Sequence, residues 1–226
     1  MNGIFNMDGP FFRFGNALAD IIILSLVWFV VSLPLVTVGA STTALFYVTT
    51  RRISNREGYL LKDFFSSFKA NFKQATLLWI LWVAVVALVI TNLFWLRSEG
   101  FNPTLAGILF PLQIIILIEL IMIVLYIFPL TARFDMKFFQ TIKSAFFMAN
   151  RHLLTTISCL CILIGIYLAA EMFFPPILVV AAGIYAYLSS YMIMNLFKKY
   201  RPEIDSDDLA NEPLAPIRDV EDRKDG

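Results

Sequence analysis

Ser32–Tyr47, SLPLVTVGASTTALFY, is the stretch of sequence that decides how the helices are arranged. Pro34 has no backbone N–H and disfavours helix at the residue before it, so a helix that begins upstream should end just before this proline. Gly39 permits unusual backbone angles, and the hydroxyl of Thr37 or Ser41 can cap a following helix. The stretch therefore predicts a break between two helices inside an apolar region.

The whole chain is unusually apolar for its length. Of its 226 residues, 59% are hydrophobic and 15% are charged, whereas soluble domains carry about 25% charged residues. A helix that crosses a bilayer needs about 20 predominantly apolar residues. The segments that meet or approach this length are residues 12–33, 37–53, 75–96, 104–130, 153–172 and 176–197. The sequence thus predicts an all-α, polytopic membrane helix bundle of five or six transmembrane helices, with residues 1–200 forming one membrane domain.

Residues 37–53 are the uncertain crossing. A helix from Ala40 to Ile53 would be about 21 Å long, which is short for a full crossing. If the segment crosses, there are six spans and both termini are cytoplasmic; if it is re-entrant, there are five spans and the N-terminus is outside. We favour six spans. The small residues of this segment suit tight helix packing, so we favour packing over a ligand cradle as its role.

The distribution of Lys and Arg predicts the orientation of the chain. Basic residues concentrate in residues 51–73, 133–151 and 198–201, whereas residues 97–103 and 171–176 carry little charge. These groups alternate along the chain as the positive-inside rule requires. The basic segments and the C-terminus are therefore expected to be cytoplasmic, in a multi-pass protein of the plasma membrane.

The last residues differ sharply from the rest. Residues 201–226 are acidic and contain no apolar periodicity. A segment of this composition does not bury enough apolar surface to fold, so we expect a disordered cytoplasmic tail. Because the basic residues elsewhere follow membrane topology, we expect no nucleic acid among the partners.

Two basic, amphipathic segments lie between the predicted spans, at residues 60–74 and 136–150. Each repeats aromatic residues at three- and four-residue steps, with lysines on other faces. Such helices lie on the cytoplasmic face of a bilayer and are attracted to anionic headgroups. The alternative is that they pack beneath the bundle without a lipid role, and both descriptions are compatible. Trp79, Trp82 and Trp95 lie towards the two ends of residues 75–96, as an aromatic belt predicts.

The two halves of the chain share short motifs. Each has a proline turn, at Pro34 and at Pro129, followed by an F-x-A-N motif that ends at Asn71 or Asn150. Repeats are common in transporters. The similarity suggests a parallel repeat, although chance similarity in an apolar sequence of low diversity is the alternative.

The motif P-x-x-T-x-G-A-x-x-x-A-L-x-Y, Pro34–Tyr47, followed by EGYLLKDFFSSFKANFKQATLLW and later by YIFPLTARFD, resembles the YesL-like family of bacterial integral membrane proteins. The likeness covers residues 5–200. The family has no established function, and the resemblance implies a plasma-membrane protein whose gene neighbours include carbohydrate-uptake transporters and glycan-degrading enzymes. It transfers no catalytic or binding residues.

Glu119 is the most unusual residue within a predicted span. An ionisable group near mid-membrane is costly, so it usually faces the bundle interior with a partner. We consider a hydrogen-bonded structural role first, then a proton- or substrate-coupling role, then contact with a partner protein. Gln113, nearly two turns earlier, extends a polar line. The candidate substrate or coupling residues are Glu119, Gln113, Thr37, Ser41 and Thr42.

Motifs for enzymatic chemistry are missing from the sequence. It contains no Walker A loop, no H-E-x-x-H and no G-x-S-x-G, and it has one histidine. Cys159 and Cys161 are two residues apart, so on a helix they point to different faces. We therefore expect no enzyme, no cofactor and no metal site.

Three functions remain. The first is an accessory or regulatory protein of carbohydrate uptake that acts with a transporter permease. The second is a small transporter or channel that uses Glu119 and the break at Pro34–Thr43. The third, a membrane enzyme acting on lipid or glycan, is the weakest because convergent acids, histidines or a reactive cysteine are lacking.

Overall fold

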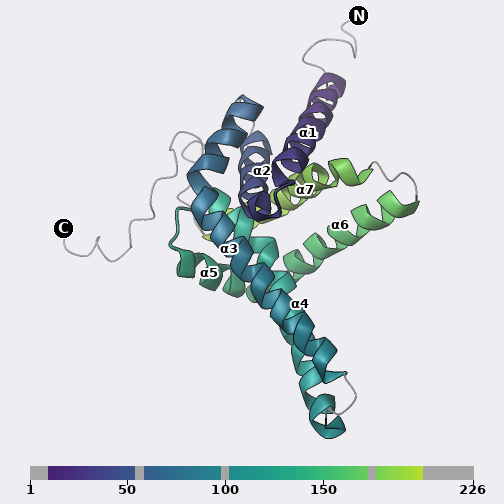
Figure 1. The fold of residues 1–226 in the computed structure, drawn as a ribbon. Coiled ribbons are helices and arrows are strands. Elements are labelled where there is room, and N and C mark those ends of the chain that lie inside the picture. Colours follow the sequence, from purple (N-terminus) through teal and green to yellow (C-terminus); the bar gives the residue numbers. More distant parts are fainter. Residues whose placement is uncertain (1–9, 54–58, 98–101, 173–176, 201–226) are drawn as a thin grey trace, which may run out of the picture.

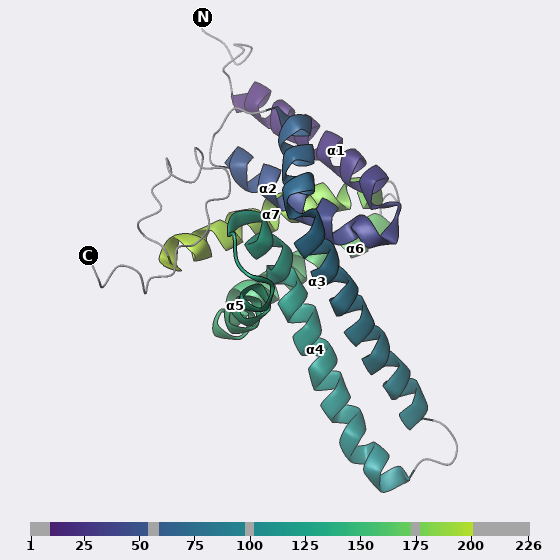
Figure 2. The ribbon, with the colours of Figure 1, turned by 60° about the vertical axis from the view of Figure 1, so that its left-hand side comes forward.

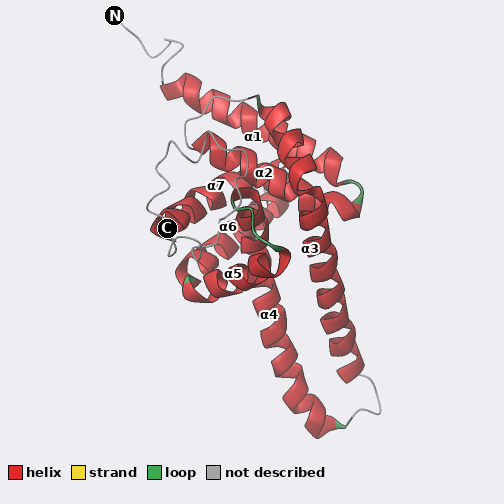
Figure 3. Ribbon diagram, turned by 90° about the vertical axis from the view of Figure 1, so that its left-hand side faces the viewer, coloured by secondary structure: helices red, strands yellow, loops and turns green. Residues whose placement is uncertain are grey.

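A computed structural model describes residues 10–53, 59–97, 102–172 and 177–200, and it contains only helices and connections in these ranges (Figures 1 and 3). The elements are α1 (Pro10–Ser32), the 3-10 turn η1 (Leu35–Thr37), α2 (Val38–Ile53), α3 (Leu60–Leu96), α4 (Pro103–Arg133), α5 (Phe138–Arg151), α6 (Leu153–Met172) and α7 (Ile177–Tyr200). The all-α class is confirmed. The predicted tail, residues 201–226, lies outside the described residues.

Four of the described helices are long and apolar enough to cross a membrane. They are α1 over Gly15–Ser32, α3, α4 and α6. The sequence predicted five or six crossings. The two that fall short are α2, with 16 residues, and α7, whose apolar part is Val180–Leu196. The length and apolar character of the four helices identify a membrane-embedded helical bundle.

The predicted break forms a helical hairpin. Helix α1 ends at Ser32 and α2 begins at Val38. The Ser32 and Ser41 hydroxyl oxygens lie 2.6 Å apart at the turn. At the far end, Arg52 Nη2 is 2.8 Å from Asp20 Oδ2. Helix α2 therefore runs back beside α1 to the level of Asp20, about 18 Å from the turn. Helix α2 is thus antiparallel to α1, although with 16 residues it is not among the four candidate spans.

The Asp20–Arg52 ion pair gives a direct test of this hairpin. Asp20→Arg and Arg52→Asp should each lower the free energy of unfolding by about 1 kcal/mol, because each places like charges side by side in a partly buried position. The double variant restores an ion pair and should recover most of that loss in detergent melting experiments. As a control, Asp20→Arg combined with Arg51→Asp should show no recovery. Equal recovery in both combinations would contradict the pairing.

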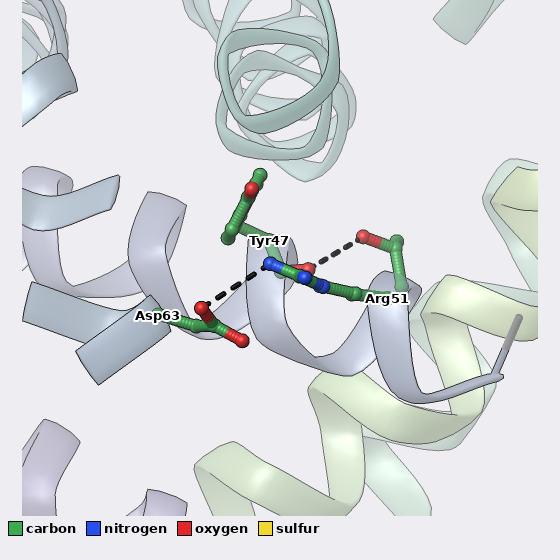
Figure 4. A network of polar contacts seen from close by, with 4 residues as sticks. Tyr47, Arg51 and Asp63 are labelled. Carbon is green, nitrogen blue, oxygen red and sulfur yellow. Dashed lines mark hydrogen bonds and ion pairs between the residues drawn. The ribbon is translucent and has the colours of Figure 1, made fainter. Parts of the chain in front are cut away.

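Helix α3 joins two segments that the sequence predicted as separate. The amphipathic residues 60–74 and the span 75–96 form one helix of 37 residues, about 55 Å long and so longer than the ~30 Å hydrocarbon core. Its first part packs along α2, and Arg51 Nη1 reaches Asp63 Oδ1 at 3.2 Å (Figure 4). The segment is helical as predicted, and the helix continues into the span with no glycine or proline between them.

The outer parts of α3 and α4 project from the rest of the molecule as a two-helix arm (Figures 1 and 2). We define the arm as residues 80–96 of α3 and 103–124 of α4. In this part of α3 the buried residues are Val89 and Leu96, and the buried residues of α4 begin only at Leu125. The arm is therefore held mainly by the contact between its own two helices.

Helix α5 confirms the second amphipathic helix, predicted over residues 136–150. Its buried residues, Thr141, Ala145 and Ala149, lie on one face, and the helix packs against α4. Phe139 and Phe147 are exposed on the other side. Helix α5 thus packs against α4 with one face and exposes apolar side chains on another, and its contact with lipid stays a prediction.

Helix α7 lies against both helices of the hairpin and against α6. Ser25 of α1 donates a hydrogen bond to the Val180 carbonyl oxygen at 3.2 Å and accepts one from the Gly183 N–H at 3.0 Å. Thr49 and Ser190 join α2 to α7 through their hydroxyls at 3.0 Å. These buried polar contacts satisfy groups that have no water to bond with, and they fix α7 on the hairpin.

Candidate functional site

The hydroxyls of the break are used within the hairpin. Thr37 Oγ1 donates to the carbonyl oxygens of Val31 and Pro34, at 2.5 and 2.7 Å. Ser41 donates to the Val38 carbonyl oxygen at 3.0 Å, in addition to its contact with the turn serine. A broken helix leaves carbonyl groups without helical partners, and these side chains satisfy some of them. These contacts are internal to the hairpin, as a packing role would require.

Thr42 also has a partner inside the protein. Its Oγ1 accepts a hydrogen bond of 3.0 Å from the indole Nε1 of Trp28 in α1. The next hydroxyl, on Thr43, is fully buried and donates to the Gly39 carbonyl oxygen at 2.9 Å. The three predicted coupling hydroxyls, Thr37, Ser41 and Thr42, thus each have a hydrogen-bond partner within the hairpin.

Helices α2 and α3 approach each other closely at Gly39. A Cβ atom at this position would collide with the Ala75 carbonyl oxygen and would lie 2.7 Å from Trp79 Cβ. The structure therefore requires glycine here for space. A hydrogen bond closes the same junction, because Trp79 Nε1 donates to the Leu35 carbonyl oxygen of η1 at 2.8 Å.

Two tryptophans of α3 connect the break to the middle of α4. The rings of Trp79 and Trp82 are stacked, with centroids 5.4 Å apart and planes at 18°. Trp82 Nε1 then donates to the Leu120 carbonyl oxygen at 2.9 Å. Both tryptophans lie near one end of residues 75–96. Both also make internal contacts that were not predicted from the sequence. An indole N–H in an apolar setting needs an acceptor, and this requirement was the available signal.

Glu119 is half-buried, and its partner comes from α5. Asn150 Nδ2 donates to Glu119 Oε1 at 2.6 Å and to the Phe146 carbonyl oxygen at 3.1 Å. A residue of the second F-x-A-N motif therefore holds the acid that the sequence singled out. Gln113 does not join them: its Oε1 is buried and has no hydrogen-bond partner among the described residues.

The two motif asparagines make the same local contact. Asn71 Nδ2 donates to the Ser67 carbonyl oxygen, four residues earlier, at 3.1 Å, as Asn150 does to Phe146. The surrounding helices differ, however, because Asn71 lies within the continuous α3. The prolines differ as well: Pro34 follows the end of α1, whereas Pro129 lies inside α4. The two halves share local contacts but not the same breaks.

The Glu119–Asn150 contact joins α4 to α5, and a double-mutant cycle should detect it. A hydrogen bond to a charged group contributes about 1.5–3 kcal/mol when well shielded, and partial exposure of this pair lowers the expected coupling to about 1 kcal/mol. The measurement is the free energy of unfolding of Glu119→Ala, Asn150→Ala and the double variant. Additive effects of the two substitutions would show that the contact contributes nothing.

The acidic side chains beside α2 are engaged in ion pairs. Asp20 and Asp63 are each paired with an arginine of α2. Within the described residues, no three His, Cys, Asp or Glu side chains are grouped so that they could hold a metal ion. Cys159 is buried and Cys161 is exposed, which confirms that they point to different faces of α6.

Comparison with known families gives one match. A family model described as "Protein of unknown function, DUF624" matches residues 21–93, roughly a third of the chain, from α1 through most of α3. No curated protein and no solved structure matches the chain. The hairpin, the break at Pro34 and the junction at Gly39 all lie within the matched segment. The finer YesL-like assignment stays a prediction, and over α1 to α3 the chain is similar to a family whose function is uncharacterised.

Proposed function

We propose that the protein is an accessory membrane protein that binds the permease of a transporter through its α3–α4 arm. The observation that carries this proposal is the exposure of the arm. Residues 103–124 of α4 include no buried residue, and residues 80–96 of α3 include only Val89 and Leu96. A polytopic bundle ordinarily buries one face of each span against other helices, so two spans that contact mainly each other have surface available for a partner.

The arm has the dimensions and chemistry of a transmembrane contact. Its 80–96 segment is about 25 Å long and predominantly apolar. Its large exposed apolar side chains are Ile80, Leu81, Val83, Val85, Leu88, Ile90, Phe94, Trp95, Leu105, Ile108, Leu112, Ile115, Ile116, Ile118 and Ile121. The helices of a permease would meet this surface by van der Waals packing, which drives helix association in lipid.

The polar residues favour this function over a transport route. The hydroxyls near Pro34 bond to the hairpin itself, and Glu119 bonds to Asn150. No hydrogen bond among the described residues links the hydroxyls of the break to Glu119. A transporter in its own right would use these groups to line a path for a polar solute, and their internal contacts argue for a structural role.

The proposal also places the first part of α3 and helix α5 at the cytoplasmic leaflet, and it takes the permease to be one of carbohydrate uptake. The first part of α3 exposes Lys62, Lys69 and Lys73, which suits the headgroup region of the cytoplasmic leaflet. The exposed phenylalanines of α5, with Lys143 beside them, suit the same anionic surface. Carbohydrate uptake rests on the family resemblance alone, and it selects carbohydrate-uptake permeases as the first partners to test.

The test is affinity purification of the tagged, full-length protein from native membranes in mild detergent. We expect a permease subunit to co-purify at near-stoichiometric yield, and the purified protein alone to give no solute flux in proteoliposomes. As a matched pair, Leu88→Gln in the arm should lower the yield of the permease, whereas Ile157→Gln on the exposed face of α6 should not. Flux by the purified protein that is lost on Glu119→Gln would instead establish the transporter function.

A further inference from the structure

The structure contains a cavity of about 330 Å³ between the α1–α2 hairpin, α6 and α7. Its size falls at the lower end of the range for ligand pockets, about 300–1,000 Å³. The residues that shape it include Trp28, Thr42, Phe46, Tyr167, Ala182 and Tyr185. Four of these six are aromatic, and neighbouring small residues of α7 leave the space open.

The wall of the cavity offers little to a polar ligand. The indole N–H of Trp28 and the Thr42 hydroxyl oxygen bond to each other at 3.0 Å. The rings of Phe46 and Tyr185 pack edge to face with centroids 6.2 Å apart. The Tyr185 hydroxyl oxygen is buried and has no hydrogen-bond partner among the described residues, so it is one polar atom in an otherwise largely apolar wall. Cavities with such apolar walls stay dry and accept apolar molecules.

The cavity lies beside helices that have the character of membrane spans. Helix α6 packs mainly against α7, and Figure 1 shows it diverging from the hairpin. Tyr167 lines the cavity from α6 and is 55% exposed, so the cavity reaches the surface there. Both α1 and α6 are long and apolar enough to cross a membrane. Spans at these two helices would place the mouth of the cavity beside the acyl chains of the bilayer.

We propose that this cavity binds one acyl chain of a membrane lipid. Hydrocarbon chains are the apolar molecules present at high concentration where the cavity opens, and the lining has no free charged group that would select a headgroup. Aromatic faces and alanine methyl groups contact a chain by dispersion. The site is independent of the arm, so its test does not depend on the accessory function.

Quenching of tryptophan fluorescence by brominated lipids tests the proposal. The full-length protein is reconstituted in phosphatidylcholine that carries bromine on its acyl chains. The chain has four tryptophans, so the difference between wild type and Trp28→Phe isolates the contribution of Trp28. Ala182→Phe fills the cavity, and we expect it to abolish most of the quenching of Trp28. Ala84→Phe, on the exposed side of α3 and outside the cavity, is the matched control. It should leave the quenching of Trp28 unchanged.

The outcomes separate a bound chain from ordinary solvation by the bilayer. If Ala182→Phe folds and leaves the quenching of Trp28 as in wild type, bulk lipid is responsible and the proposal is wrong. If that variant does not fold, native mass spectrometry of the wild-type protein decides. We expect a retained adduct with the mass of one phospholipid, and a spectrum without any retained lipid would overturn the proposal.

Discussion

Gly39→Ala should lower the free energy of unfolding by about 3 kcal/mol, at the upper end of the usual cost of overpacking. The new methyl group would collide with the Ala75 carbonyl oxygen and with Trp79 Cβ, 2.7 Å away. A backbone carbonyl has no other rotamer, so α2 and α3 must separate. That movement would also strain the hydrogen bond between Trp79 and η1.

The expected result is a large drop in the melting temperature of detergent-purified protein, measured by loss of the monodisperse peak in size-exclusion chromatography after heating. Gly107→Ala in α4 is the matched control, since a Cβ atom there meets nothing within 4 Å. In that position alanine favours the helix by up to about 1 kcal/mol. Equal melting temperatures for the two variants would show that α2 and α3 do not approach closely at Gly39.

Gly183→Ala should produce a second large loss, also of about 3 kcal/mol. A Cβ atom at Gly183 would collide with Ser25 Oγ and would lie 2.7 Å from the Ile21 carbonyl oxygen. The substitution would also displace the serine that accepts the hydrogen bond from the Gly183 N–H. Helix α7 would then move away from α1 and leave that buried amide without its partner.

The same melting assay applies, with Gly165→Ala in α6 as the control because its Cβ would face open space. Combining Gly183→Ala with Ser25→Ala should cost less than the sum of the two single substitutions, since both remove the same contact. Strict additivity, or a melting temperature for Gly183→Ala that equals the control, would contradict the packing of α7 on α1.

The break at Pro34 was predictable because its causes are local. A proline ends a helix through its own ring and missing N–H, whatever surrounds it. The observed end of α1 at Ser32 and start of α2 at Val38 follow from that chemistry. The direction of α2 is shown by the Asp20–Arg52 pair. This pair joins residues 32 positions apart and leaves no local trace in the sequence, so the sequence did not reveal it.

The continuity of α3 was not predictable from its pattern. Its basic, amphipathic beginning is typical of an interfacial helix, and its apolar end is typical of a span, yet no residue between them stops the helix. Whether such a helix bends at the membrane surface depends on what it packs against. Here α2 lies along the first part of α3, and that tertiary contact decides the outcome.

The candidate site was predictable in part for the same reason. The cost of an acid in an apolar helix indicates that Glu119 needs a partner. The identity of the partner, Asn150, depends on where α5 packs against α4. The role of Thr37 and Ser41 followed more directly, because short hydroxyl side chains next to a break bond to the backbone beside them.

Site-specific photo-crosslinking in native membranes tests the accessory function most directly. A photoreactive amino acid is placed at Ile108 on the arm, which is 64% exposed, and as a control at Ile164 on α6, which is 53% exposed. The proposed function predicts one discrete adduct with a permease subunit from Ile108 and only lipid adducts from Ile164. Lipid adducts alone from both positions, or an adduct of Ile108 with a second copy of this chain, would contradict it.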